Sequence, residues 1–230
     1  MEQRTIEWYK ARLGHITSSM VYNIMGTPRK KGETFTDTAK SYLYGIAAER
    51  MMADEYKGDK FGEWLERTDT TTRAMRWGTD NEDMARMLYS LNIDGSLSVK
   101  EHGFTEYIEG LYGDSPDGLV VTTDNAPKVV GVLEIKCPNS STFVKYRHLL
   151  AEGKTLKEVE EKYYWQVQSH MMCQQCDWCD FVIYDKMMAD PLYITRIPRN
   201  NDDIQALQER IIAARDFLNN LTATHEDKTE

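Results

Sequence analysis

The sequence contains no apolar run long enough to cross a membrane. No stretch approaches the roughly 20 apolar residues that a spanning helix needs, and residues 1–10 lack the apolar core of a secretory signal. Internal repeats, low-complexity blocks and linkers rich in proline and glycine are missing as well. We therefore expect a cytoplasmic protein with no membrane partner, forming a single domain over residues 1–230 with a flexible acidic tail at residues 222–230.

Cationic side chains are in the minority. The chain has 28 Lys and Arg residues against 37 Asp and Glu residues, which gives a net charge of −9. Because phosphate groups are bound by cations, this balance argues against a protein that coats DNA non-specifically. It is compatible with an enzyme that holds metal cations in a carboxylate site, since the local field governs binding in a groove.

Cysteine is scarce, and its four copies are Cys137, Cys173, Cys176 and Cys179. So few thiols in a chain of this length exclude a disulfide scaffold. The C-x-x-C-x-x-C run at residues 173–179, with Cys137, offers the thiolates that zinc and iron–sulfur centres use. The run is expected to begin at a helix end and finish in a strand, which is unfavourable for such a centre. We therefore expect unpaired, mostly buried cysteines and no iron–sulfur cluster.

Hydrophobic periodicity predicts the order of helices and strands. Apolar residues at helical spacing predict helices over residues 18–25, 38–56, 79–91, 140–151, 155–176 and 201–221. Runs of β-branched and apolar residues predict strands over residues 97–108, 118–123, 129–137, 179–184 and 192–197. Thr17 or Ser18 is expected to cap the first helix and Asp37 the second, with a loop at residues 57–70. This order indicates an α/β (α+β) fold, with a central mixed β-sheet of about five strands flanked by helices.

Two short segments carry the residues best suited to chemistry. Asp117 lies at a tight turn before a predicted strand, and Glu134 and Lys136 lie two residues apart on another strand. Side chains two apart on a strand point to the same face, and Ile135 points to the other. If the two strands pair as a hairpin, Asp117 approaches Glu134. Two carboxylates and one ammonium group then meet at one end of a sheet.

This trio suits the hydrolysis of a phosphodiester. Hard oxygen ligands from Asp117, Glu134 and the Ile135 carbonyl can bind Mg²⁺, which polarises a phosphate and activates water. Lys136 can orient or deprotonate that water, or neutralise charge in the transition state. The other reading is a solvated Glu134–Lys136 ion pair and an ordinary Asp117–Gly118 turn. The apolar surroundings of Glu134 favour the first reading, because buried charges rarely lack a partner or a task.

The spacing of these residues resembles the PD-(D/E)xK nuclease motif. Pro116–Asp117 is followed by sixteen residues and then by Glu134–Ile135–Lys136. The pieces that extend the resemblance are Trp8 with Arg12, Leu13, Gly14, Ile16, Thr17 and Ser19; Trp77–Gly78 with Glu82; Ser115–Gly118; Leu133–Pro138; and Gln166–Gln168. They occur in the order found in phage lambda exonuclease and its YqaJ-type viral recombinase relatives. The resemblance covers about residues 8–184.

The resemblance implies a restriction-endonuclease-like core and a 5′→3′ exonuclease. Such an enzyme degrades one strand of linear double-stranded DNA from a 5′-phosphorylated end and leaves 3′ overhangs for phage-type homologous recombination. It also implies two Mg²⁺ ions (with Mn²⁺ as a substitute), a homotrimer ring around the DNA and a single-strand annealing protein as partner. The protein would be encoded by a phage or prophage and would act in the cytoplasm of a bacterial host.

The resemblance also assigns roles by position. Asp117, Glu134, Glu82 and the Ile135 carbonyl match metal ligands, and Lys136 matches the catalytic lysine. Gln166 matches a glutamine near the attacking water. Arg12, Ser19 and Ser115 match residues that hold the 5′-phosphate. Further candidates for phosphate or DNA binding, taken from the sequence itself, are Thr17, Arg73 and Met75.

Several of these positions have structural alternatives. Thr79 and Glu82 have the spacing of a capping box, so Glu82 is either a helix cap or a metal ligand. Arg12 precedes a predicted helix near Ser18, where a helix N-terminus and a guanidinium would hold a phosphate, or it forms a surface salt bridge. Gln166 lies in an aromatic and methionine stripe that is more typical of core packing than of DNA stacking.

Met75 and Trp77 lie beside Arg73 and Arg76. An apolar residue among arginines can wedge apart a terminal base pair, but the same pattern fits a buried methionine and tryptophan. At the level of the whole chain, two alternatives to the exonuclease also stand. One is a PD-(D/E)xK endonuclease with site or structure specificity, and the other is a non-catalytic DNA-processing subunit.

Overall fold

A computed structural model describes residues 1–222, and none of the helices in that part of the chain is long and apolar enough to cross a membrane. Of the predicted tail at 222–230, only Thr222 lies within the described residues, as the last residue of a helix. The chain forms two compact units. Unit 1 comprises Met1–Asp69, Phe104–Ser115 and Asn201–Glu230, and unit 2 comprises Thr70–Gly103 and Pro116–Asn200. The single nuclease domain over residues 1–230 stays a prediction.

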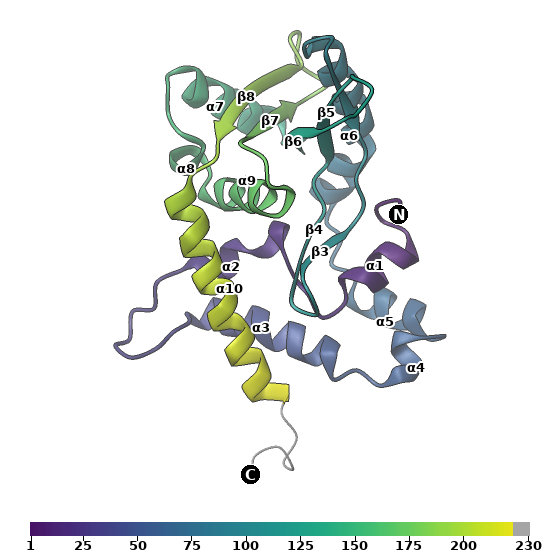
Figure 1. The fold of residues 1–230 in the computed structure, drawn as a ribbon, viewed down its shortest axis with the longest axis vertical. Helices are drawn as coiled ribbons and strands as arrows, with labels where there is room; N and C mark the ends of the chain where they lie inside the picture. The colour runs from purple at the N-terminus through teal and green to yellow at the C-terminus, as the bar shows by residue number, and fades with distance from the viewer. Residues whose placement is uncertain (223–230) are drawn as a thin grey trace. The chain divides into compact units, whose positions relative to one another are not determined.

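Unit 2 contains the five-stranded mixed sheet that the sequence predicts (Figure 1). Its strands are β2 (Leu97–Lys100), β5 (Gly118–Thr122), β6 (Val129–Lys136), β7 (Trp178–Tyr184) and β8 (Leu192–Pro198), in the order β2-β5-β6-β7-β8. β6 and β7 run parallel, and the other neighbours are antiparallel. The predicted hairpin is confirmed, because Gly118 of β5 pairs with Leu133 of β6.

The helices of unit 2 are α6 (Arg73–Asn92), α7 (Ser140–Ala151), α8 (Leu156–Val159) and α9 (Glu161–Gln174). Ala85 and Tyr89 of α6 pack in one apolar cluster with Leu133 and Ile135 of β6. Because successive residues of a strand face opposite sides, Glu134 belongs to the other face. That face meets α9, which packs against β6 and β7. The sheet therefore presents its apolar side to α6 and Glu134 to α9.

Unit 1 is built from helices around a small sheet. Its elements are α1 (Ile6–Arg12), β1 (Ile16–Thr17), the 3₁₀ helix η1 (Ser18–Met20), α2 (Tyr22–Met25), α3 (Asp37–Arg50), α4 (Asp54–Lys57), α5 (Phe61–Thr68), β3 (Thr105–Ile108), β4 (Tyr112–Asp114) and α10 (Asn201–Thr222). β4 pairs with β1 in parallel and with β3 antiparallel. α10 packs against α2 and α3 (Figure 1). Arg210 of α10 donates hydrogen bonds to the carbonyls of Ile24, Gly26 and Thr34.

Several predicted boundaries are wrong. The strand predicted over residues 97–108 is two strands, because β2 joins the sheet of unit 2 and β3 that of unit 1. The loop predicted over 57–70 contains α4's last residue and α5, in which Phe61 is buried and contacts Trp64 one turn later. Thr36, not Asp37, caps α3, since its side chain accepts the Ala39 N–H.

Three predicted helices are interrupted. The helix over 38–56 divides into α3 and α4, and the helix over 155–176 divides at Glu160, which has an extended backbone. The helix over 18–25 is η1 followed by α2, and neither uses a Thr17 side-chain cap. α1 and β4 were not predicted.

A substitution at Gly131 of β6 would test how closely the sheet packs at this position. A Cβ added at Gly131 would lie 2.4–2.5 Å from three atoms of the Trp178 ring. We expect Gly131→Ala to lower the free energy of unfolding of unit 2 by about 1–3 kcal/mol, because the indole has to move from a packed position. Urea denaturation measures the change. Gly78→Ala is the matched control, because Gly78 lies in α6 with nothing within 4 Å of an added Cβ, and it should be neutral or stabilising. Equal stability of Gly131→Ala and wild type would contradict the packing described.

Candidate active site

Asp117 and Glu134 meet at one end of the β5–β6 hairpin. Asp117 immediately precedes β5, and its Oδ2 accepts a hydrogen bond of 2.7 Å from the backbone N–H of Ile135. Burial raises the pKa of Asp117 well above its ordinary value, and the negative charges of Glu134 and Glu82 raise it further. The predicted approach of the two carboxylates is therefore present. Their mutual repulsion is partly offset by Lys136.

Glu134 is held from two directions. Lys136 Nζ donates to Oε1, and Nε2 of His170 on α9 lies 2.9 Å from Oε2. The Glu134 side chain is only 1% exposed. Burial by itself would raise its pKa, but the charge of Lys136 and the hydrogen bond from His170 lower it below the ordinary value. Glu134 is thus an ionised carboxylate in a buried setting, which excludes the solvated ion pair considered from the sequence.

Lys136 remains an ammonium group. Its Nζ lies 4.7 Å from the centroid of the Tyr163 ring, a favourable cation–π contact. Burial alone would lower its pKa, but Glu134 and Asp117 raise the pKa above its ordinary value. A lysine in this state donates hydrogen bonds and neutralises negative charge. The contacts of Lys136 with Glu134 and the Tyr163 ring suit its orienting and charge-neutralising roles.

Glu82 is not a helix cap. α6 begins at Arg73, and its first turn is capped by Thr72, whose side chain accepts the Met75 N–H. Thr79 lies inside the helix, where its hydroxyl donates to the Met75 carbonyl. The capping-box alternative is therefore wrong, and Glu82 is buried.

Arg86 connects Glu82 to the hairpin, and the sequence analysis missed it. Its guanidinium donates to Glu82 Oε1 at 2.8 Å and to the Asp117 carbonyl at 3.0 Å. It also pairs with Asp83 at 2.8 Å. An arginine four residues after Glu82 is the one local signal that the sequence offered. Arg86 holds Glu82 and the Asp117 turn together.

The carboxyl ends of β6 and β7 add two further groups. Burial raises the pKa of the Cys137 thiol to about 12, and the charges of Glu82, Asp117 and Asp185 contribute. Asp185 follows β7 and is 1% exposed. Its Oδ1 accepts the Met187 N–H, whereas Oδ2 has no hydrogen-bond partner among the described residues. The site therefore carries an excess of buried negative charge.

The donor set fits a hard divalent cation. Carboxylate and carbonyl oxygens are the ligands that Mg²⁺ prefers, and a cation would counter the effects of burial and of neighbouring carboxylates that together raise the pKa of Asp117. Within residues 1–222, however, no three His, Cys, Asp or Glu side chains already stand in a metal-binding arrangement. Glu134 is engaged by Lys136 and His170, and Glu82 by Arg86. A carboxylate oxygen that accepts one hydrogen bond keeps a second lone pair, so Glu134 could ligate a cation in this orientation, whereas Glu82 would have to turn away from Arg86.

Gln166 is buried on α9, one helical turn before His170. Residues four apart on a helix share a face, so Gln166 lies on the side of α9 that reaches Glu134. None of the four cysteines is assigned a role in this chemistry. Cys176 and Cys179 are buried, Cys137 and Cys173 are half-buried, and all four are free thiols. The expected lack of an iron–sulfur cluster stays a prediction.

The candidate 5′-phosphate residues of unit 1 gather around Trp8. The Arg12 guanidinium lies 4.1 Å from the centroid of the buried Trp8 ring, and Trp8 Nε1 donates to Ser115 Oγ at 3.1 Å. Arg12 also donates to Thr17 Oγ1 at 3.4 Å and to Ser19 Oγ at 3.5 Å. Trp8 thus packs within the protein and positions both Arg12 and Ser115.

The helix contribution expected at Ser18 is absent from this group. Arg12 ends α1, and the residues after Thr17 form only η1 and the four-residue α2. Helices this short provide little dipole, so the argument from a helix N-terminus is wrong. The Arg12 guanidinium and the hydroxyl groups of Thr17 and Ser19 are still suited to bind a phosphate. Arg12 and Thr17 line a pocket of about 250 Å³ together with Tyr42 and Glu49.

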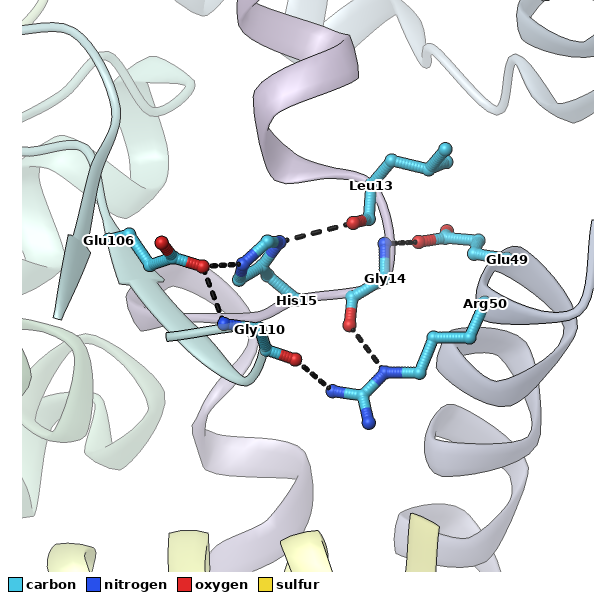
Figure 2. A network of polar contacts seen from close by, with 7 residues as sticks. All are labelled: Leu13, Gly14, His15, Glu49, Arg50, Glu106 and Gly110. Carbon is cyan, nitrogen blue, oxygen red and sulfur yellow. Dashed lines mark hydrogen bonds and ion pairs between the residues drawn. The ribbon is translucent and has the colours of Figure 1, made fainter. Parts of the chain in front are cut away.

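A polar network fixes the turn between Arg12 and β1 (Figure 2). Gly14 has φ +74°, a conformation that favours glycine, and its N–H donates to Glu49 at 2.7 Å. Arg50 donates to the carbonyls of Gly14 at 2.9 Å and Gly110 at 2.7 Å. His15 contacts Glu106 at 2.6 Å. The network joins the turn to α3 and to the β3–β4 hairpin, and so orders the backbone that carries Arg12 and Thr17.

The residues of the predicted wedge lie at the start of α6. Met75 is 56% exposed, so the alternative of a buried Met75 is wrong. Arg73 and Arg76 are also exposed. Trp77 is half-buried, and Lys186 Nζ lies 4.5 Å from the centroid of its ring. An exposed methionine between two arginines is available to a DNA end.

Comparisons with known proteins show which proteins the chain resembles. Among solved structures, an alkaline exonuclease from Laribacter hongkongensis (LHK-Exo) is 30% identical, with a TM-score of 0.69 over 93% of this chain and 92% of that chain. LHK-Exo in complex with dAMP gives 29% identity and a TM-score of 0.70 over the same shares. A phage-related exonuclease from Haemophilus somnus 129PT is 19% identical, with a TM-score of 0.61 over 90% of this chain and 94% of that chain, and shows the fold alone.

No curated protein matches the chain. The five-stranded mixed sheet flanked by helices is the restriction-endonuclease-like fold of the alkaline exonucleases, which confirms the predicted fold class. The family model of the YqaJ-like viral recombinase domain matches residues 7–177, most of the chain. The chain therefore belongs to the YqaJ-like viral recombinase domain family.

Proposed function

We propose that the protein is a Mg²⁺-dependent 5′→3′ exonuclease that degrades one strand of linear double-stranded DNA from a 5′-phosphorylated end. The observation that carries the proposal is the cluster of buried Glu134 with half-buried Asp117 and Lys136 at the end of the β5–β6 hairpin. The family and the similarity to alkaline exonucleases support a recombination-associated exonuclease acting on DNA. A deoxynucleoside monophosphate such as the dAMP bound to LHK-Exo is the product class of exonucleolytic cleavage.

Each residue of the cluster would have a separate role in the reaction. When bound, two Mg²⁺ ions (or Mn²⁺ in their place) would supply polarisation of the phosphate and activation of the attacking water. Asp117, Glu134 and the Ile135 carbonyl, with Glu82 beside them, are the oxygens that would hold the metal. Lys136 donates to the attacking water or to the phosphate oxygens and neutralises the charge that develops there. Gln166 would orient the water.

The remaining assignments give the reaction its direction. Arg12, with Thr17, Ser19 and Ser115, would hold the terminal 5′-phosphate, because a guanidinium and hydroxyls form charge-assisted hydrogen bonds to phosphate. Recognition of one chemical end sets the polarity of digestion. Arg73 and Met75 would contact the DNA end and separate its terminal base pair. The proposal also includes a homotrimer ring, a single-strand annealing protein as partner, and action in the cytoplasm of a bacterial host.

End-labelled DNA tests the polarity. A linear duplex with 5′-phosphates is labelled at either the 5′ or the 3′ end of one strand and incubated with Mg²⁺. We expect the 5′ label to leave at once as mononucleotide, while the 3′ label stays in long fragments until late. Early release of the 3′ label would contradict the polarity. Cleavage at one internal position would instead indicate a site-specific endonuclease.

A further inference from the structure

Glu134 has a partner that the nuclease motif does not contain. His170 lies on α9, 36 residues further along the chain, and its Nε2 is 2.9 Å from Glu134 Oε2. Both side chains are only 1% exposed. Because water has no access to this contact, the bond between them cannot be replaced by solvent. His170 is therefore the hydrogen-bond partner of one Glu134 oxygen, Oε2.

The direction of this hydrogen bond follows from its surroundings. Lys136 donates to the other oxygen of Glu134, and a carboxylate can only accept. The Nε2 atom of His170 must then carry the hydrogen. Glu134 is thus held between an ammonium group from its own strand and an imidazole N–H from the helix that covers this face of the sheet. Two donors from independent elements leave the carboxylate one orientation.

We propose that His170 is a positioning residue that orients Glu134 for the divalent cation, an inference that rests on the proposed metal-dependent function. Hydrogen-bond partners of metal ligands fix the ligand's orientation before the metal arrives. Lys136 cannot perform this role alone, since it occupies the opposite oxygen and is itself assigned to the phosphate chemistry. Gln166 precedes His170 by one turn, so the two buried polar residues share one face of α9.

Magnesium affinity tests the proposal without relying on catalysis. Isothermal titration calorimetry of the full-length protein with MgCl₂, in the absence of DNA, measures the dissociation constant. We expect His170→Leu to raise that constant about 10- to 100-fold. His170→Gln should recover most of the affinity, because its terminal amide donates from near the position of Nε2. His170→Asn should not, because its amide is closer to the Nδ1 position.

The matched control is Gln168→Leu. Gln168 lies two residues away on the same helix, is fully buried, and bonds the Pro198 carbonyl at 3.0 Å and the Asn200 N–H at 2.9 Å. Its loss should lower the melting temperature without changing the Mg²⁺ dissociation constant. A rate assay on linear duplex DNA should show His170→Leu needing a correspondingly higher Mg²⁺ concentration for half-maximal activity.

Three results would overturn the positioning role. They are unchanged Mg²⁺ affinity in His170→Leu, an equal loss of affinity in Gln168→Leu, and failure of His170→Gln to recover affinity beyond His170→Asn. If His170→Leu does not fold, the comparison of His170→Gln with His170→Asn decides. If the wild-type protein itself binds no Mg²⁺, the proposed metal-dependent function fails, and that outcome is separate from any difference between the variants.

Discussion

Replacement of Lys136 by alanine is expected to lower the rate of phosphodiester hydrolysis by about 10²- to 10³-fold. The ammonium group of the half-buried Lys136 lies against Glu134 and the Tyr163 ring, where water screens its charge less than at an exposed site. Removing it takes away both a donor to the reacting groups and the cation that offsets Asp117 and Glu134. The measurement is single-turnover digestion of a 5′-phosphorylated linear duplex at saturating enzyme and Mg²⁺.

Lys162→Ala is the control for this effect. Lys162 is exposed, and its Nζ lies 5.9 Å from the centroid of the same Tyr163 ring. A lysine on the surface of α9 should contribute nothing to the chemical step, so this variant should digest DNA as wild type does. Binding of duplex DNA to Lys136→Ala, measured in Ca²⁺ to prevent cleavage, should change little. Wild-type hydrolysis by Lys136→Ala would remove Lys136 from the mechanism.

Replacement of Arg12 by alanine is expected to abolish discrimination between 5′-phosphorylated and 5′-hydroxyl ends. Wild type should digest the phosphorylated end faster, and Arg12→Ala should lower that rate about 10- to 100-fold, to the level of the hydroxyl end. The reason is that Arg12 is the cation of the group formed with Thr17, Ser19 and Ser115. Initial rates on two duplexes that differ only in the 5′ group measure the effect.

Lys10→Ala is the matched control for Arg12. It removes a cation from the same helix, but Lys10 is exposed and bonds the Gly58 carbonyl at 3.2 Å instead of the Trp8 group. Its preference for the phosphorylated end should equal that of wild type. Arg12→Lys keeps the charge without the planar fork and should retain part of the preference. A full preference in Arg12→Ala would show that the phosphate is recognised elsewhere.

The central part of the fold was readable from the sequence because its signals are local. The alternation in residues 129–137 marks β6, and Asp117 next to Gly118 marks the turn before β5, so the hairpin and its carboxylate pair followed. The order of apolar runs also gave the five strands of the main sheet. Apolar residues repeat every two positions in a strand and every three to four in a helix, because one face of each element is buried. Such patterns can therefore be read from the sequence.

The errors arise where long-range packing overrides the local pattern. Residues 97–108 look like one strand, but their two halves pair with different sheets. The Thr79–Glu82 spacing suggested a cap, whereas Thr72 begins the helix two turns earlier. Arg86 and His170 reach Asp117 and Glu134 across 31 and 36 residues, and no local pattern reports such contacts. The Arg86–Asp117 and His170–Glu134 contacts were therefore visible only in the structure.

The measurement that most directly tests the nuclease assignment uses linear and covalently closed circular DNA in parallel. Each is incubated with the wild-type protein in Mg²⁺, and again after EDTA is added in excess. We predict that the linear duplex is converted to mononucleotides and single-stranded DNA, that circles stay intact, and that digestion stops once EDTA has removed the metal. Cleaved circles would contradict an exonuclease that needs an end. Undigested linear DNA in Mg²⁺ would contradict the assignment of Asp117, Glu134 and Lys136 as a nuclease site.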